Sequence, residues 1–177
     1  MNDITEELLE KHMDQDSYFI VAAQESAPSK ETLVEAGSQL GCIFPEEYLA
    51  HATSAYGGVY IEVKEDIWPR AKAHDAGPFW SFLYGLYVFN LTPDIPDFMN
   101  IKTCAEQFRK ETGHSIVPFL KVIGDANVYC FDDSGHVVRW DHDSNEIAPE
   151  NKSFFEVLDF ELGELRERKE RKVAGEA

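Results

Sequence analysis

The side chains best suited to chemistry in this sequence lie between positions 132 and 143. They are of types that bind metal ions: Asp132, Asp133, His136, Asp141, His142 and Asp143. A metal site would need several of them on one side of the chain. Only residues two apart share a face of a strand, so a hairpin here would separate most of these side chains. We interpret them as polar turn residues and predict neither a metal site nor a cofactor.

Other catalytic patterns are missing from the sequence. The histidines at 51, 74 and 114 have no HExxH spacing, and no G-x-S-x-G, G-x-G-x-x-G or P-loop motif occurs. Cys42, Cys104 and Cys130 form no CxxC pair and lie among apolar residues, so we expect reduced, buried thiols. The sequence therefore predicts a protein that is not an enzyme. The alternative is an enzyme or small-ligand-binding protein with a pocket among the aromatic residues of 79–89 and the His and Asp groups.

The elements that carry these residues begin with a predicted three-stranded meander from Ile116 to Trp140. Its runs are rich in the β-branched and aromatic residues typical of half-buried strands. Gly124-Asp125 and Asp133-Ser134-Gly135 tolerate the positive φ of tight turns. Links this short require antiparallel pairing, because a parallel crossover needs a dozen or more residues. Pro118 cannot donate to a ladder, so we place it at a strand start or a sheet edge.

Local signals predict the remaining elements. Ser29 and Gly41 are expected to bound one helix, and Asn100 and Gly113 another. Further predictions are a helix over 3–15, a strand over 18–21, a helix with Pro45 at its first position, a strand over 59–63, and one bulged strand or two short strands over 77–90. A last helix is predicted to begin with the capping box Ser153 to Glu156 and to bury Phe155, Leu158 and Leu162. We expect its end to fray beyond Arg166.

The net charge of −17 is the most unusual global property. Residues 166–177 hold five basic and three acidic groups, a net +2, so the rest of the chain carries −19. Such a body repels nucleic acid and anionic membranes and attracts basic partners, although plain solubility also explains it. No apolar run approaches the ~20 residues of a membrane span, and the acidic N-terminus does not match a signal peptide. We therefore predict a cytoplasmic protein.

The order of motifs over roughly residues 30–165 resembles the SUKH superfamily. At the start, the resemblance rests on Leu40-Gly41, Phe44-Pro45-Glu46-Glu47-Tyr48 and Tyr56-Gly57-Gly58. At the end, it rests on Ile116-Val117-Pro118-Phe119, the Gly124-Asp125 turn, Cys130-Phe131-Asp132, Gly135-His136-Val137-Val138 and Ser153-Phe154-Phe155-Glu156. The middle matches by position only. The chain departs from the family in its N-terminal extension, in a loop at 74–78 and in its basic tail.

This resemblance implies an α+β fold in which helices pack on one face of a twisted, mostly antiparallel sheet. It also implies a bacterial immunity protein that binds and neutralises a cognate toxin, often a nuclease, or else a regulatory interaction scaffold like the fungal regulator of cell-wall synthesis. We divide the chain into an N-terminal extension (1–28), a SUKH-like domain (29–165) and a charged C-terminal tail (166–177).

The residues predicted to bind a basic toxin domain are acidic groups near an aromatic side chain in the least regular segments: Glu62, Glu65, Asp66, Trp68, Asp94 and Asp97. Loops carry recognition on rigid scaffolds, aromatic anchors supply affinity, and charges steer encounter. The competing interpretation is an acidic surface kept for solubility, with Trp68 partly buried. The sequence leaves the oligomeric state open.

Overall fold

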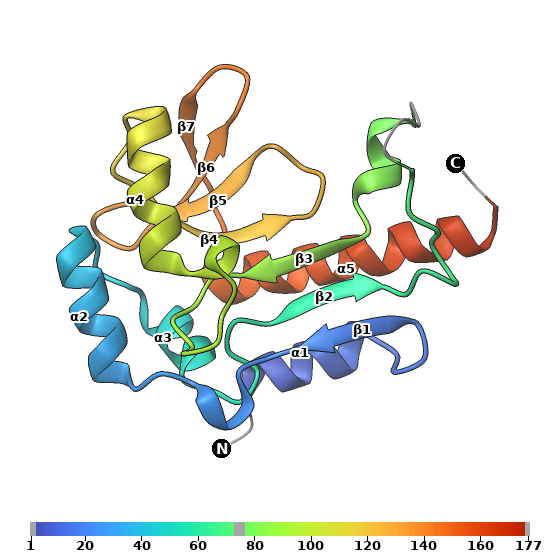
Figure 1. The fold of residues 1–177 in the computed structure, drawn as a ribbon, viewed down its shortest axis with the longest axis horizontal. Helices are drawn as coiled ribbons and strands as arrows, with labels where there is room; N and C mark the ends of the chain where they lie inside the picture. The colour runs from blue at the N-terminus through green and yellow to red at the C-terminus, as the bar shows by residue number, and fades with distance from the viewer. Residues whose placement is uncertain (1–2, 73–76, 176–177) are drawn as a thin grey trace.

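A seven-stranded sheet runs through the computed structural model, which describes residues 3–72 and 77–175 (Figure 1). The strands lie in the sheet in chain order, and every neighbouring pair is antiparallel. They are β1 Tyr18–Val21, β2 Tyr60–Val63, β3 Gly85–Val88, β4 Val117–Val122, β5 Val128–Phe131, β6 Val137–Asp141 and β7 Glu146–Pro149. The predicted α+β class with an antiparallel sheet is confirmed. The meander is formed by β4, β5 and β6, and Pro118 is the second residue of its strand, beside a bulge in the pairing with β5.

Local signals correctly predict both ends of two helices and the start of a third. The helices are α1 Ile4–His12, α2 Lys30–Leu40, α3 Glu46–Ala52, α4 Ile101–Thr112 and α5 Phe154–Val173, with 3₁₀ turns η1 Gln24–Ser26, η2 Phe79–Phe82 and η3 Asp97–Met99. Ser29 caps α2 by accepting from the Thr32 amide, and Gly41 ends it with a φ of 71° that favours glycine. The predicted capping box between Ser153 and Glu156 is formed at the start of α5. No helix in the described part of the chain combines the length and the apolar character of a membrane span.

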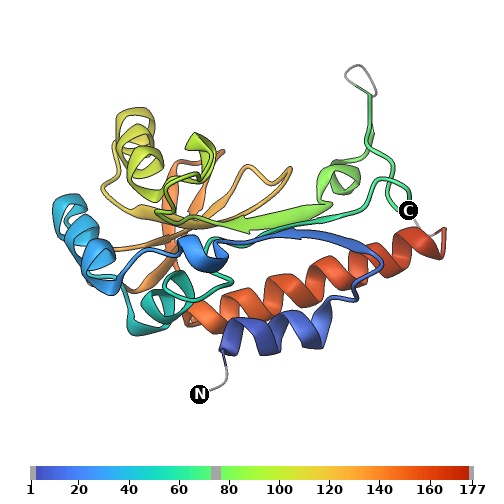
Figure 2. The same ribbon diagram turned by 60° about the horizontal axis from the view of Figure 1, so that its bottom comes forward.

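The helices do not all pack on one face of the sheet, which corrects the prediction. In Figure 2, α1 and α5 run beneath the sheet and α4 lies above it. The alternation of β5 agrees: Tyr129 and Phe131 join the core with α5, whereas Cys130 lies in a second cluster with Phe108 of α4. A strand sends successive side chains to opposite faces, so the two helices cover opposite sides of the meander.

The main core lies between the sheet and α3, α5 and α1. Phe119 and Phe131 stack at 4.1 Å between ring centroids, and Phe154 of α5 packs against both. The buried Tyr48 hydroxyl donates to the Phe89 carbonyl at 2.8 Å, which joins α3 to the sheet. The α5 residues Leu158 and Leu162 are fully buried, as predicted, while Phe155 is only partly buried.

Several local predictions were wrong. Residues 77–90 form η2 followed by the single strand β3, and Pro45 is the N-cap of α3 and not its first residue. Strand β7 was missed, and α5 continues as a helix to Val173. Cys42 and Cys130 are buried, but Cys104 is only partly buried. Most of the predicted 74–78 loop lies outside the described residues.

Candidate protein-binding face

Strands β1 to β3 leave one face of the sheet uncovered by α1 and α5. Ile61 and Val63 point into the core, so Tyr60 and Glu62 of the same strand point to the other face. In register with them, Phe19 and Val21 of β1 lie on this side and are 50% and 49% exposed. We call the surface formed by β1–β3 and the neighbouring loop 91–99 the open face.

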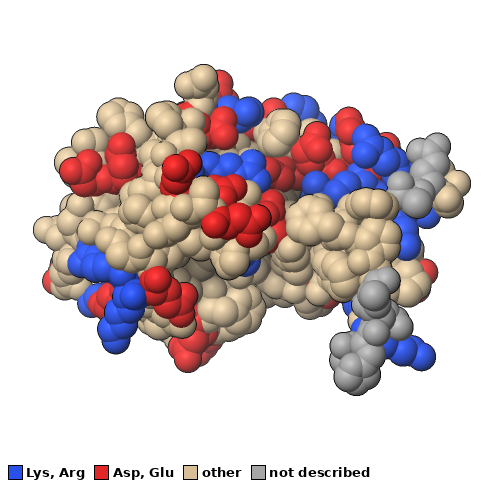
Figure 3. Space-filling model, turned by 90° about the horizontal axis from the view of Figure 1, so that it is seen from above, with Lys and Arg blue, Asp and Glu red and all other residues tan. Residues whose placement is uncertain are grey.

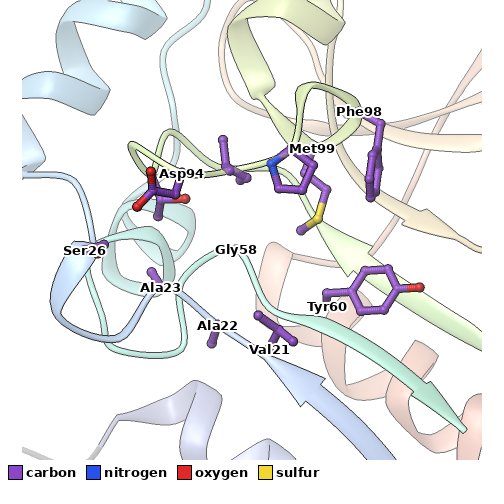
Figure 4. A pocket seen from close by; sticks show the side chains of 12 residues that line it. Val21, Ala22, Ala23, Ser26, Gly58, Tyr60, Asp94, Phe98 and Met99 are labelled. Atoms are coloured by element: carbon purple, nitrogen blue, oxygen red, sulfur yellow. The ribbon is translucent and has the colours of Figure 1, made fainter. Parts of the chain in front are cut away.

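A cleft of about 400 Å³ lies on the open face, between the end of β1 and the loop 91–99. Figure 4 shows Val21, Tyr60, Phe98 and Met99 around it, with Asp94 on its opposite rim. Its lining comprises Val21, Ala22, Ala23, Ser26, Gly58, Tyr60, Thr92, Asp94, Ile95, Pro96, Phe98 and Met99. The ionisable groups in this lining are Asp94 and Tyr60, so the cleft is an apolar hollow with one carboxylate at its edge.

Aromatic rings form a continuous layer beside the cleft. Tyr60 and Tyr87 stack at 6.1 Å between ring centroids, and Phe98 meets Tyr87 edge to face at 5.3 Å. Phe98 is 52% exposed, whereas Tyr87 is partly buried. This burial raises the pKa of the Tyr87 hydroxyl to about 12. Burial and a 2.7 Å hydrogen bond to Glu62 likewise raise the pKa of Tyr60. These phenols stay neutral and present apolar ring surface with a polar tip, which suits protein contacts.

The structure brings three of the predicted binding residues to the open face. Glu62 lies on β2, partly exposed, where it accepts from Tyr60 and approaches Arg70 at 3.7 Å. Asp94 lines the cleft, and Asp97 begins η3 with an exposed side chain. A shared surface therefore carries acidic groups from two segments that are distant in sequence.

The other three predicted residues lie elsewhere. Glu65 and Asp66 are exposed in the turn that follows β2. Trp68 is 3% exposed, so it cannot contact a partner in this conformation. Its indole N–H donates to the Ser81 carbonyl at 3.1 Å, which satisfies the polar end of a ring that is otherwise buried against Tyr84. Exposed aromatic side chains on the open face are instead Phe19 and Phe98.

Sequence reasoning missed Phe19, Val21 and Phe98. The run of aromatic and β-branched residues from Tyr18 to Val21 indicated a strand, but not that the strand would lie at an edge of the sheet with one face uncovered. Phe98 stands between Asp97 and Met99 in a proline-rich loop, where no periodicity separates exposed from buried residues. An aromatic side chain beside a predicted acidic loop residue was the available signal.

The net negative charge does not form a continuous acidic surface on every side. Figure 3 shows Asp and Glu side chains interleaved with Lys and Arg side chains on one face of the molecule. Recognition must therefore depend on where the acidic groups lie and not only on their total. At the open face, Glu62, Asp94 and Asp97 stand beside exposed aromatic rings.

Two buried polar clusters lie away from the open face. Burial raises the pKa of Glu161 on α5, which accepts from the Tyr129 hydroxyl at 2.7 Å. His51 is fully buried: its Nε2 accepts from the Gly58 amide at 3.2 Å, which leaves Nδ1–H to donate to Thr5 Oγ1 at 2.9 Å. Burial lowers the pKa of His51 to about 4, so the ring is neutral and links α1, α3 and the turn before β2. Both clusters are buried away from solvent, and their hydrogen bonds stabilise the fold.

The polar residues at 132–143 are distributed over turns. Within residues 3–72 and 77–175, no group of three or more His, Cys, Asp or Glu side chains could hold a metal ion. Asp132 accepts from the Ser134 and His136 amides, and Asp141 accepts from the Ser144 amide. These carboxylates stabilise tight turns, as predicted from their spacing.

Comparison with known proteins assigns the chain to a family. The model of the SMI1/KNR4 family (SUKH-1) matches residues 27–159. Neither a search of curated proteins nor a search of solved structures returns a match. The match covers well over half of the chain and includes α2 to α4, β2 to β7, the open-face loop and the start of α5. The protein therefore belongs to the SMI1/KNR4 family (SUKH-1).

Proposed function

We propose that this protein is a bacterial, cytoplasmic immunity protein that neutralises a basic toxin domain, such as a nuclease, by binding it through the open face. The observation that carries the proposal is the joint presence of exposed aromatic and acidic side chains, from β1, β2 and the loop 91–99, around one apolar cleft. Aromatic anchors in a desolvated hollow supply affinity, and surrounding carboxylates select a basic partner.

The family supports a binding role. It is known for immunity proteins and cell-wall regulators, and its members generally bind partner proteins without catalysing a reaction. The cleft lining agrees with this class, because its ionisable groups, Asp94 and Tyr60, include no nucleophile–base pair. We place the SUKH-like domain at 29–165, with residues 1–28 as an extension and 166–177 as a charged tail.

A regulatory scaffold is the second candidate, because an exposed aromatic and acidic face would equally hold a regulatory protein. The two roles differ in the consequence of binding. An immunity protein must abolish the activity of its partner at a stoichiometry of one to one, whereas a scaffold leaves the partner active. Toxin activity in the presence of increasing amounts of this protein therefore discriminates between them.

The experiment begins with a candidate toxin domain encoded next to the gene for this protein, as the variable C-terminal part of a large secreted protein. Bacteria that express the toxin domain in their cytoplasm should die, and co-expression of this protein should restore growth. The purified pair should form a stable complex. Growth that is not restored, with no complex detected, would reject the proposal.

Association kinetics then test the acidic residues. A charge-reversed Asp94→Lys/Asp97→Lys variant should associate more slowly than wild type at low salt. The Glu65→Lys/Asp66→Lys variant should also be slowed, because these carboxylates lie in the turn directly after β2 and add to the field that steers a basic partner, although they are outside the open face. Steered association can reach about 10⁸–10⁹ M⁻¹s⁻¹ at low salt and falls as screening shortens the Debye length, which is ~8 Å at physiological ionic strength.

The matched control is Asp133→Lys/Glu146→Lys, which changes the net charge equally at exposed positions on the β5–β6 turn and on β7. It should retain more of the wild-type rate than either test variant. Equal slowing by all three variants would mean that only total charge matters. A wild-type rate that does not depend on salt would reject steering by these carboxylates.

A further inference from the structure

The free edge of the sheet at β1 carries three consecutive exposed apolar side chains. Phe19, Ile20 and Val21 are 50%, 38% and 49% exposed, and β1 has a sheet neighbour on one side only, β2. Edge strands usually carry charges, proline or a bulge that block pairing with another chain. The register of β1 with β2 is continuous, and none of its four residues is charged or proline.

The opposite edge strand, β7, carries residues that block pairing with another chain. Strand β7 contains Glu146 and ends at Pro149, which cannot donate a backbone hydrogen bond. Ile147, at 36% exposure, is its one large apolar residue. The two edges of one sheet therefore differ, and only β1 presents an unblocked apolar strand.

Backbone groups of β1 point outward at alternate residues. The Lys64 amide donates to the Ser17 carbonyl, on the side of β1. The Val63 amide points to the opposite side of β2 and donates to the Tyr84 carbonyl. In this register, Phe19 and Val21 bond to β2, and the N–H and C=O groups of Tyr18 and Ile20 point to the free edge. Ile20 thus offers one donor and one acceptor to an added strand.

A hollow lies on each side of this edge. Val21 lines the open-face cleft, whereas Ile20 lines a second cleft of about 470 Å³ with Ala22, Gln24, Glu25, Ala55 and Tyr56. An added strand would direct successive side chains to opposite faces, so neighbouring apolar residues could enter the two hollows in turn. Main-chain bonds with alternating side-chain pockets are the features of recognition by strand addition.

The surroundings of the edge are acidic. Residues 3–25 contain one lysine, Lys11, and seven acidic residues: Asp3, Glu6, Glu7, Glu10, Asp14, Asp16 and Glu25. The basic side chains near this edge are fewer and already have partners: Lys11 and Lys169 pair with Asp159 and Asp14, and Lys64 and Arg166 donate to the Gln15 and Lys11 carbonyls. Glu6 accepts from Tyr56 at the second cleft, and Asp94 stands at the first. A second copy of this chain would bring two such acidic edges together, whereas a basic strand would be attracted.

From these contacts we infer that β1 is the docking edge for an extended segment of the partner protein, with two or three apolar residues at its centre and Lys or Arg on both sides. The inference rests on the proposed function and specifies how the partner is held. The segment pairs with Tyr18 and Ile20, places alternate apolar side chains in the two clefts, and sets its basic residues against Glu6, Glu25 and Asp94.

The test uses the full chain, labelled with ¹⁵N, and the synthetic peptide Lys-Arg-Val-Ile-Val-Lys-Arg with blocked ends. In the free protein, the amides of Tyr18 and Ile20 should exchange faster than those of Phe19 and Val21. At saturating peptide, exchange at Ile20 should slow at least tenfold, and chemical shifts should change along β1 and both clefts. A peptide with Glu in place of Lys and Arg should bind at least tenfold more weakly.

Two substitutions test the edge itself. Ile20→Pro removes an outward N–H without removing a bond to β2, and Ile20→Lys adds charge without changing the backbone; each should weaken peptide binding at least tenfold. Ile147→Pro and Ile147→Lys are the matched controls, because the β6–β7 register also points the Ile147 N–H away from the sheet. They should bind within twofold of wild type. Loss of the fold in Ile20→Pro, seen by circular dichroism, leaves Ile20→Lys to decide.

The inference is overturned if the peptide causes no shift at β1 at millimolar concentration, if it binds another surface, if the acidic peptide binds equally well, or if the chain forms a β1-mediated dimer. Its failure is separable from that of the proposed function. Ile20→Lys that neutralises the toxin with wild-type affinity would reject strand addition and leave the immunity role intact. If the basic peptide binds at β1 but the protein protects against no toxin, strand addition is supported and the immunity role is rejected.

Discussion

Acid should destabilise this fold through His51, the neutral imidazole that links Thr5 of α1 to the Gly58 turn. Burial lowers its pKa from 6.5 to about 4, so between these pH values the imidazole is protonated in the unfolded chain and neutral in the folded one. Because the folded pKa is the lower one, the stabilisation is complete above pH 6.5 and is lost as the pH falls toward 4. With these two values, the loss between pH 7 and pH 5 is about 2 kcal/mol.

The assay is urea unfolding of the wild type and of His51→Gln at pH 7, 6 and 5. The glutamine amide can still accept from the Gly58 amide, but it does not titrate. The variant should therefore not show the loss of unfolding free energy that His51 causes as the pH falls. The variant should be less stable at pH 7, where the bond to Thr5 is missing, and the difference should narrow by about 2 kcal/mol at pH 5. His136→Asn, which removes an exposed imidazole, controls for the loss of a histidine. Stability curves of wild type and His51→Gln that run parallel from pH 7 to pH 5 would refute the reasoning.

Two further predictions concern packing and the thiols. Leu158→Ala should reduce the free energy of unfolding by about 2–5 kcal/mol, because the side chain is fully buried between α5 and the sheet; a loss under about 0.5 kcal/mol in urea titration would mean that the helix is not docked. Burial raises the thiol pKa of Cys42 to about 12 and that of Cys104 to about 11, and it raises that of Cys130 as well, so a disulfide reagent at pH 8 should label the native protein far more slowly than the urea-unfolded chain. Equal labelling rates would contradict this burial.

Local chemistry explains which elements could be predicted. Ser29, Asn100 and Ser153 cap their helices through bonds that span two or three residues, and Gly41 ends α2 by its own φ. Such signals do not depend on distant segments, so they are readable in sequence. Strand β7 was missed because its four residues are exposed and show no apolar alternation.

The remaining features depend on contacts between distant segments. The periodicity of α4 indicated which side of the helix is buried, but not that Phe108 would meet the face of the sheet opposite α5. Residues 79–82 have strand-like composition, yet they form η2, where the Ser81 carbonyl accepts from the Trp68 indole. The acidic residues of the open face were predicted from their charge and from their place in the least regular segments. Their aromatic neighbours Phe19 and Phe98 were not, since exposure at a sheet edge is a property of the assembled sheet.

The contact between the two ends of the chain bears on how this protein is made. His12 of α1 binds Asp159 of α5 across 147 residues of sequence, and Lys169 binds Asp14. At a synthesis rate of about 5–20 residues per second, roughly 7–30 s separate the emergence of these partners from the ribosome. During that interval, α1 has no α5 to pack against, so a segment that is synthesised before the sheet is among the last to reach its final place. Nascent chains should therefore expose the apolar side of α1, which includes Leu9, to chaperones until α5 has been completed.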